Sequence, residues 1–532
     1  MANTLNLGDG NWGVKDSSLL GYAKDNTKFV PETFDVTRAS SGTRVNKDGL
    51  IETVEETLSG ELITNGDFDT DTWWLKSSAN VNISNGKGNY TAGTPVEYFY
   101  KLNVLTVGKE YKLTYEITDY TTGYITGYGG NWSIVAEDVG VQEVYFTAND
   151  AGFGLVGYNF IGSIDNVSVI EINQDNLARI DYTDGTEGVL LTEPQSTNTA
   201  LYSSEASNAW WFKANVTITA NQGISPDGTN NAELLEATSG NGVIYRTGVT
   251  TGSLSFFAKI VNIGNAKFRI SVDNVGSASW NGDGTLNTVS GGTATSGISY
   301  GNGWYRFTLN VTSGTVLNYG LTNATSGDSI LIYGMQNEAS LSYSTSYIPT
   351  YGQIASRAAD VVTNGGDVSN FNSEEGVLFV EMAALADATP QEVSFAISEG
   401  QSGANRLLIR MKTNGAIGVV LRVANTTQAD INSSALNQSV SHKVALKWKL
   451  NDIALWIDGV EVGTDSLANV FPANTLDEVS FNQGNNSNPF YGKTKNIQVF
   501  NTALTDEELY NLTSDRYATY DIMATDLTFD KQ

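Results

Sequence analysis

The residues in this sequence with the clearest spacing for chemistry are aromatic and lie in "DYTTGYITGYGGNW", residues 119–132. An even spacing puts side chains on one face of an extended segment, and the aromatic residues found at every fourth position are Tyr120, Tyr124, Tyr128 and Trp132. Aromatic rings bind the apolar faces of sugars by stacking, and the intervening glycines leave room for a ligand. The alternative is that the rings fill a sandwich core, or that the glycines break the strand. The spacing predicts a sugar-binding platform, with core packing as the alternative.

Hydrolysis through a serine nucleophile would have to use His442, the only histidine, at the start of an expected strand in "SVSHKVALKW". No Gly-x-Ser-x-Gly elbow accompanies it, so we expect an exposed or strand-end histidine without a catalytic role. A single histidine also excludes transition-metal sites built from several histidines.

Glycoside hydrolysis needs two carboxylates roughly 5 to 10 Å apart across a cleft. Acids at alternate positions, as in Glu-x-Asp-x-x-Glu, would project to one face of a strand, but the sequence lacks that string. "FVEMAALAD" offers only Glu381, and Asp458 in "WIDGVEV" belongs to a turn. We therefore expect turn and rim roles for these acids and no catalytic residue.

Composition limits the function classes further. The chain has 532 residues, more than the roughly 250 to 300 at which single cores stop growing, so we expect several domains. Its 30 Lys+Arg against 58 Asp+Glu give a net charge of −28, which disfavours nucleic acids and anionic membrane surfaces as partners. There is no cysteine, which excludes disulfides and thiolate zinc sites. The sequence shows neither a signal-peptide pattern nor a bilayer-length apolar stretch, so we expect no membrane insertion and no secretory export.

Local patterns predict an all-β chain with one short helix. Abundant Gly, Tyr and Phe with only 8 Pro are typical of strands joined by turns. Period-two alternation in "SLSFFAKI" and "WYRFTLNV" predicts half-buried strands. Asp458-Gly459 between "IALWI" and "VEVG" predicts a two-residue hairpin. In "TALTDEELYNLTSD", Thr505 and Glu508 predict a helix with a capping box.

An internal repeat divides the chain. "WWLKSSANVNIS" from Trp73 and "WWFKANVTIT" from Trp210 align once two residues are dropped from the first, and each copy closes on a similar strand, "GSIDNVSVIEI" and "SGDSILIYGMQNE". The repeat predicts two copies of one β-sandwich type. Neighbours on a strand point to opposite faces, so we expect one tryptophan of each pair in the core and the other on a surface or inter-domain contact.

Two family resemblances extend this picture. "WKLNDIALWIDGVEVG" and "GKTKNIQVFNTALTDEEL" resemble the concanavalin A-like, laminin-G-type jelly roll. "ELITNGDFDTDTWW" and "IDNVSVIEI" resemble a carbohydrate-binding module of the galactose-binding-like jelly-roll group. In such modules acids at matching positions hold a structural calcium, which the resemblance places at Asp67 or Asp69 with Asp165; solvated turn acids are the alternative.

A third resemblance covers the segments around the repeats. "TRASSGTRVNKDGLIE", "NLARIDYTDGTEGVLLTEPQSTN", "SNAWWFKANVTITANQGISPDGTNNAELL" and "SYIPTYGQIASRAADV" resemble a module of bacteriophage virion proteins, chiefly fibres and other appendages. In that module "GLIE" runs almost directly into "ARIDY", whereas here a jelly roll separates them. We interpret this jelly roll as an insertion.

These observations predict tandem jelly-roll β-sandwiches with a definite partition. The expected parts are an N-terminal virion-attachment segment with the first part of the phage module (1–59), an inserted jelly roll (60–173), a return linker (174–197), a second jelly roll (198–349), a linker (350–373), a concanavalin A-like jelly roll (374–515) and a tail (516–532). The "YGMQNEASLSYSTSYIPT" stretch, with Glu338, is expected to be a structural seam between the last two jelly rolls and not a site.

The resulting functional expectation is a bacteriophage structural protein displayed on the particle surface, a homotrimer by resemblance. It would contact other virion proteins through its N-terminal segment and adhere weakly to host-surface or environmental glycans, with avidity from repeated copies. The alternatives are a polysaccharide depolymerase with a glycosidase-type third module and a purely structural decoration protein.

Overall fold

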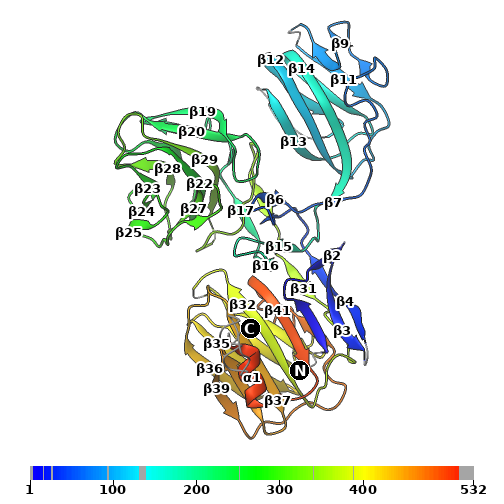
Figure 1. Ribbon diagram of the computed structural model, residues 1–532, viewed down its shortest axis with the longest axis vertical. Coiled ribbons are helices and arrows are strands. Elements are labelled where there is room, and N and C mark those ends of the chain that lie inside the picture. The colour runs from blue at the N-terminus through cyan, green and yellow to red at the C-terminus, as the bar shows by residue number, and fades with distance from the viewer. Residues whose placement is uncertain are drawn as a thin grey trace, which may run out of the picture. The chain divides into compact units, whose positions relative to one another are not determined.

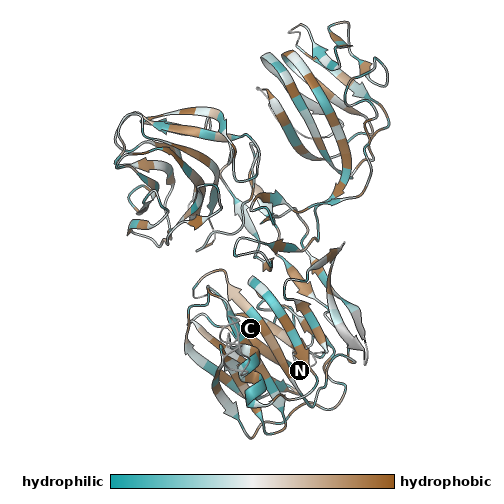
Figure 2. Ribbon diagram, in the orientation of Figure 1, coloured by the Kyte–Doolittle hydropathy of each residue, from teal (hydrophilic) through white to brown (hydrophobic). Residues whose placement is uncertain are grey.

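The computed structural model describes residues 4–514 except 16, 26–27, 93–94, 131–138, 251, 340 and 388. Over these residues the chain is nearly all β with one helix, which confirms the predicted fold class. Figure 2 shows hydrophobic and hydrophilic residues alternating along many strands, as sandwich strands require. The chain forms two compact units, one made of Glu55–Gln174 and the other of Met1–Val54 with Asp175–Gln532.

The unit Glu55–Gln174 is the first jelly roll, an eight-stranded antiparallel sheet around an aromatic core. Its longest strands, β12 and β14, pair along most of their length and form the middle of the sheet (Figure 1). The strands are β7 (Glu56–Thr57), β8 (Leu75–Lys76), β9 (Val81–Ser84), β10 (Lys87–Tyr90), β11 (Glu97–Lys101), β12 (Glu110–Tyr128), β13 (Gly140–Thr147) and β14 (Phe153–Asn173).

The second jelly roll, within the other unit, has two six-stranded sheets around a core of its own. One sheet has the order β18-β21-β28-β23-β24-β25, with β18 (Phe212–Ala214), β21 (Val243–Thr247), β23 (Lys267–Val272), β24 (Gly276–Trp280), β25 (Leu286–Ser290) and β28 (Val316–Thr322). The other has the order β19-β20-β29-β22-β27-β26, with β19 (Val216–Gly223), β20 (Ala232–Ala237), β22 (Ser253–Asn262), β26 (Ile298–Ser299), β27 (Trp304–Asn310) and β29 (Ser329–Glu338).

The third sandwich packs a five-stranded sheet and a twelve-stranded sheet around the largest core. The five-stranded sheet consists of β33 (Val393–Ser398), β34 (Arg406–Met411), β35 (Ala416–Val423), β36 (Thr426–Ala435) and β40 (Glu478–Ser480). From the C-terminal part of the chain, the other sheet takes β31 (Val361–Thr363), β32 (Glu375–Ala384), β37 (His442–Lys449), β38 (Ile453–Ile457), β39 (Val460–Asp465) and β41 (Gly492–Phe500).

The N-terminal strands belong to this same twelve-stranded sheet. They are β1 (Leu5–Gly8), β2 (Gly13–Lys15), β3 (Ser18–Asp25) and β4 (Lys28–Thr37). β1 pairs with β41, and Leu5 and Leu7 are buried in the shared core. The structure thus differs from the expected separate N-terminal segment, because strand β41 has an edge that needs hydrogen-bond partners and the chain start supplies them. A pairing across almost 500 residues leaves no local sequence pattern.

The expected linkers 174–197 and 350–373 also contain strands. β15 (Arg179–Asp181) pairs with β16 (Val189–Thr192), which continues onto β41. Two small two-stranded sheets complete this region, β5 (Thr43–Val45) with β6 (Ile51–Thr53), and β17 (Ser196–Asn198) with β30 (Ala355–Arg357). These segments are ordered by strand pairing and are not simple connections.

Two local predictions are confirmed. Helix α1 (Asp506–Thr513) begins after Thr505, whose hydroxyl accepts the Glu508 N–H, and the Glu508 side chain accepts the Thr505 N–H in return. Asp458 and Gly459 form the turn between β38 and β39, with φ of 49° and 79°. Positive φ at both turn residues is what a tight hairpin turn of this type requires.

The tryptophan repeat has the same geometry in both copies. Trp74 and Trp211 are buried, whereas Trp73 and Trp210 are only partly buried, and the rings of each pair meet edge to face. Each buried indole N–H donates to a carbonyl nine residues upstream, at 2.8 Å in both copies. The prediction that one tryptophan of each pair is in the core is confirmed, whereas the other packs partly buried against the same core. Both pairs lie in turns that precede β8 and β18 and not in strands.

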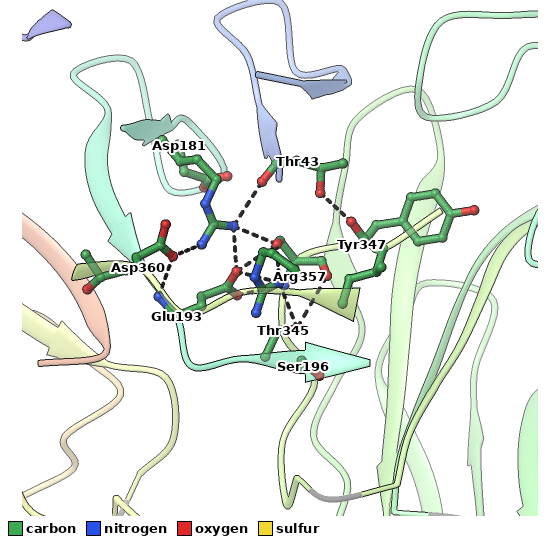
Figure 3. A network of polar contacts seen from close by, with 12 residues as sticks. Thr43, Asp181, Glu193, Ser196, Thr345, Tyr347, Arg357 and Asp360 are labelled. Atoms are coloured by element: carbon green, nitrogen blue, oxygen red, sulfur yellow. Dashed lines mark hydrogen bonds and ion pairs between the residues drawn. The ribbon is translucent and has the colours of Figure 1, made fainter. Parts of the chain in front are cut away.

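A buried charge network holds the segments around the second jelly roll together (Figure 3). Arg179 forms ion pairs with Glu193, at 2.6 Å, and with Asp360. Arg357 contacts the same oxygen of Glu193 at 3.0 Å, and Arg38 contacts Asp360 at 3.0 Å. All five side chains are almost fully buried. Although burial by itself would raise it, the guanidinium groups of Arg357 and Arg179 lower the pKa of Glu193 to about 2.

Backbone groups and hydroxyls complete this network. Ser346 donates both its N–H and its hydroxyl to Glu193, at 2.7 Å each, and Arg357 donates to the Pro194 carbonyl at 2.8 Å. Glu338, which is 1% exposed, accepts from Ser196 and from the Thr345 N–H. The expected seam is therefore a structural junction. Within it, Ser346 hydrogen-bonds to Glu193, and Thr345 hydrogen-bonds to Glu338 and Arg357.

We predict that Arg179→Met strongly destabilises the protein. The substitution leaves Glu193 and Asp360 buried with one cation fewer, and breaking a buried pair on one side costs about 3–5 kcal/mol. The measurement is denaturant unfolding of the full chain. Arg44→Met is the matched control, because its ion pair with Glu52 is partly exposed and exposed pairs contribute about 0–1 kcal/mol. Equal losses in the two variants would contradict the assignment.

Candidate functional site

The candidate site is a row of tyrosines on one face of the first jelly roll. In β11, "EYFYK", Tyr98 and Tyr100 alternate with Glu97 and Phe99, which are buried. Alternation sends Tyr98 and Tyr100 to the outer face of the sheet. The same alternation around the buried Ile125 sends Tyr124 and Tyr128 outward at the end of β12.

The strand register brings these tyrosines together across three strands. β14 lies between β11 and β12 (Figure 1). Gly154 of β14 is directly opposite both Tyr100 and Tyr128, and Tyr158 is directly opposite Tyr124. Residues directly opposite on neighbouring strands share a face. We call the five residues Tyr98, Tyr100, Tyr124, Tyr128 and Tyr158 the tyrosine face.

Ring contacts give this face its shape. Tyr124 and Tyr158 are stacked with centroids 5.2 Å apart, and Tyr98 and Tyr100 meet at 5.3 Å. Gly154 keeps the centre flat, because a Cβ there would lie 2.8 Å from the Phe99 carbonyl oxygen. The Tyr128 hydroxyl donates to Asp150 at 3.1 Å, and this hydrogen bond raises the pKa of Tyr128. The face therefore offers apolar ring surface edged by hydroxyls.

Of the four aromatic residues singled out from the sequence, the structure brings only Tyr124 and Tyr128 to this face. Tyr120 packs on the core, with its ring 6.2 Å from that of the buried Phe160. The register of β12 against β14 shifts between Tyr120 and Thr122 and again before Tyr124, so an even residue spacing does not give one face there. Trp132 lies outside the described residues.

Sequence reasoning missed Tyr98, Tyr100 and Tyr158. The alternation of "EYFYK" indicates that Tyr98 and Tyr100 share a face. Nothing in the sequence indicates that β14 places Tyr158 beside Tyr124, because that pairing depends on the long-range register.

The predicted calcium residues lie near one another without forming a cage. Asp67 and Asp69 are exposed, and burial, Glu116 and Asp67 each contribute to raising the pKa of Asp165. Among the described residues, no group of three or more acidic or histidine side chains could hold a metal ion. The structural calcium stays a prediction.

His442 lies at the first position of β37, and only 7% of it is exposed. Its Nδ1 is 2.6 Å from Asp458 Oδ2, and its Nε2 is 3.0 Å from the Asn437 carbonyl oxygen. Both ring nitrogens face acceptors, which favours the doubly protonated ring. The hydrogen bond to Asp458 accordingly raises the pKa of His442. No serine hydroxyl forms a hydrogen bond with the ring within the described residues, and the arrangement ties the hairpin turn to the start of β37.

Two cavities in the unit that contains the second and third sandwiches have no carboxylate in their lining. A cavity of about 220 Å³ is bordered by Tyr343, Tyr491 and Gln391, and a smaller one of about 50 Å³ by Tyr347 and Arg357. Neither has an acid in its lining. Glu381, the acid considered for hydrolysis, lies 3.5 Å from Lys495 in an ion pair on the twelve-stranded sheet.

Comparison with known protein families supports the concanavalin A-like fold predicted for the third sandwich. Residues 378–510 match the family described as the concanavalin A-like lectin/glucanases superfamily. We found no match to the chain among curated proteins. Over the residues that the structure describes, no helix is long and apolar enough to cross a membrane.

Several solved structures are similar over about a quarter of the chain. The Ruminococcus gnavus IT-sialidase CBM40 bound to alpha2,3 sialyllactose is 22% identical, with 26% of this chain and 83% of that chain covered and a TM-score of 0.23. The leech intramolecular trans-sialidase is 23% identical over 28% of this chain and 24% of that chain, with a TM-score of 0.24. The heptameric SAP-like pentraxin of Limulus polyphemus is 13% identical over 27% and 71%, with a TM-score of 0.22. Sequence identities and TM-scores this low support no inference about function.

We predict that His442 makes stability depend on pH. A raised folded-state pKa contributes stability that is fully present below the unfolded value of about 6.5 and is lost as the pH rises through the folded value. Thermal unfolding should therefore show a larger gap between the native protein and His442→Ala at about pH 5.5 than at about pH 8.5. Because His442 is the only histidine, the difference between the two curves reports this residue alone.

Asp458→Asn is the matched variant for this experiment, because asparagine keeps the turn conformation and removes the charge. It should flatten the same pH dependence. A gap that is constant with pH would contradict the paired imidazolium.

Proposed function

We propose that this protein is a glycan-binding adhesin and that the tyrosine face of the first jelly roll binds the sugar. The observation that carries the proposal is the convergence of five tyrosines from three strands on one outer face. Tyr128 is 38% exposed and the other four are partly buried. Rings held at their edges by neighbours can stack on the apolar face of a sugar at little cost in side-chain entropy.

The hydroxyls supply the polar part of recognition. Tyr128 is oriented by Asp150, and within the described residues the hydroxyls of Tyr98, Tyr100, Tyr124 and Tyr158 have no hydrogen-bond partner. Sugar hydroxyls can satisfy these groups. A shallow face of this kind binds weakly, so adhesion would depend on several copies acting together.

The proposal extends to a bacteriophage particle, on whose surface the protein would be displayed as a homotrimeric appendage. The support for this part is the resemblance of four sequence segments to a module of phage fibres. Three of them contain the network residues Arg38, Arg179, Glu193, Arg357 and Asp360. The N-terminal strands would contact other virion proteins through the sheet that they extend.

We predict that Tyr124→Ala and Tyr128→Ala each weaken glycan binding by roughly 3- to 10-fold, since an aromatic contact contributes about 0.5–1.5 kcal/mol beyond its buried area. The measurement is a glycan array at high protein density, followed by titration of the best glycan. Tyr510→Ala is the matched control, because Tyr510 on helix α1 has the same 38% exposure as Tyr128.

Two other results would favour a different function. An array without binding at any density would favour a decoration protein. A fall in the viscosity of a polysaccharide solution during incubation would favour a depolymerase.

A further inference from the structure

The second jelly roll presents a face that corresponds to the tyrosine face. Its β18 and β21 pair as β8 and β11 do in the first jelly roll, with Phe212 opposite Tyr245 where Leu75 is opposite Tyr100. In each copy the next residue is basic and lies over the partly buried tryptophan, Lys101 at 5.4 Å and Arg246 at 4.7 Å from the ring centroid.

The side chains on this face differ from those of the first copy. One row runs from Tyr245 through Asn318 and Ser271 to Ser277 across neighbouring strands. The row beside it runs from Gly320 through Arg269 to Ser279. Between the two rows, Ile244, Tyr319 and Ile270 point into the core. Asn318, Ser271 and Ser279 are only 8%, 3% and 5% exposed, so the accessible part of this face consists of Phe212 and the partly exposed Tyr245, Lys267, Arg269 and Ser277.

Gly320 places no side chain on this part of the face. Its φ is 150°, and a Cβ there would lie 2.2 Å from the Gly242 carbonyl oxygen. At the aromatic end, Phe212 is 43% exposed and its ring lies 5.3 Å from that of Tyr245.

Two cations, Lys267 and Arg269, lie on β23 along this face. Arg246 lies on the core side of β21, because Ile244 two residues before it and Leu317 opposite it are both in the core, and it donates to the Trp210 carbonyl at 2.7 Å. Alternation with the buried Phe268 and Ile270 directs the two β23 side chains outward. The Nε of Arg269 donates to Ser271 at 3.1 Å, which orients the guanidinium on the face. Neither Lys267 nor Arg269 forms an ion pair among the described residues, although the chain carries 58 acids against 30 Lys and Arg.

The acids beside this face are already engaged. Asp273 accepts from Asn318 at 2.9 Å, and Asp283 accepts from the Thr285 hydroxyl at 2.6 Å. Lys267 is close enough to help lower the pKa of Asp283, after the hydrogen bonds from Thr285. Arg269 is thus the cation whose guanidinium is left with donors for an outside carboxylate.

We propose that this outer face, with Arg269 as its cation and Phe212 and Tyr245 as its stacking residues, binds acidic saccharides that carry a carboxylate. The guanidinium fork matches a carboxylate in geometry, and the rings match the apolar side of the sugar. Ser277, which is partly exposed, provides a hydroxyl for hydrogen bonds to the sugar. This site is separate from the tyrosine face and does not depend on it.

The experiment measures binding of an oligogalacturonate and of the uncharged galactose oligomer of the same length to the full chain by calorimetry. The native protein should bind the acidic oligomer at least about tenfold more tightly, since hydrogen bonds to charged groups are the stronger class. Arg269→Gln should remove about tenfold of that affinity and leave the neutral oligomer unaffected.

Lys259→Gln is the matched control. Lys259 also lacks an ion pair within the described residues, but it lies on β22 in the other sheet of the same jelly roll. It should leave both affinities unchanged. Arg269→Lys keeps the charge without the fork and should lie between the native protein and Arg269→Gln.

Three results would overturn the proposal. The first is equal affinity of the native protein for the two oligomers, or no binding of either. The second is an equal loss in Lys259→Gln and Arg269→Gln, which would indicate general charge attraction. The third is a loss of oligogalacturonate binding in Tyr128→Ala but not in Arg269→Gln, which would place the acidic ligand on the tyrosine face.

Discussion

The buried charge network of Arg38, Arg179, Arg357, Glu193 and Asp360 is the interaction on which the larger unit depends. Its members come from segments that are up to 322 residues apart in the chain, as the Arg38–Asp360 contact shows. Charges can be buried only when opposite charges and hydrogen bonds satisfy them. The five side chains must therefore all be in place together, so the network specifies one arrangement of the segments that enter and leave the second jelly roll.

This constraint explains the sequence motifs around the repeats. "TRASSG", "LARIDY", "TEPQSTN" and "SRAADV" contain no pattern typical of a catalytic site, but each contributes a network residue or its hydrogen-bond partner. Arginine suits such a position because its planar guanidinium has several donors, so Arg179 can reach Glu193, Asp360 and Ser346 at once.

The two repeated jelly rolls show how one scaffold can carry different surfaces. Both keep the buried tryptophan, its hydrogen bond nine residues upstream and the basic residue over its neighbour. These contacts are internal, so they constrain the fold. The outer positions of the corresponding strands are free to differ, and they carry tyrosines in one copy and arginine, serine and asparagine in the other. Binding properties can therefore diverge while the packing stays the same.

Local physical chemistry let the sequence alone determine much of this protein. Five features depend only on neighbouring residues or on short periodic patterns, which can be recognised in the sequence itself. They are the capping box of Thr505 and Glu508, the Asp458-Gly459 hairpin, the all-β class, the tryptophan repeat and the third sandwich.

The candidate platform was predictable only in part. Tyr124 and Tyr128 share a face, whereas Tyr120, before the register shifts in β12, packs against the core. Only the tertiary structure decided which tyrosines meet across β11, β14 and β12, that the chain start completes the sheet of the third sandwich, and that distant arginines and carboxylates form one buried network. Each of these depends on a long-range register or on desolvation of a charge, and both are properties of the folded chain that no local pattern records.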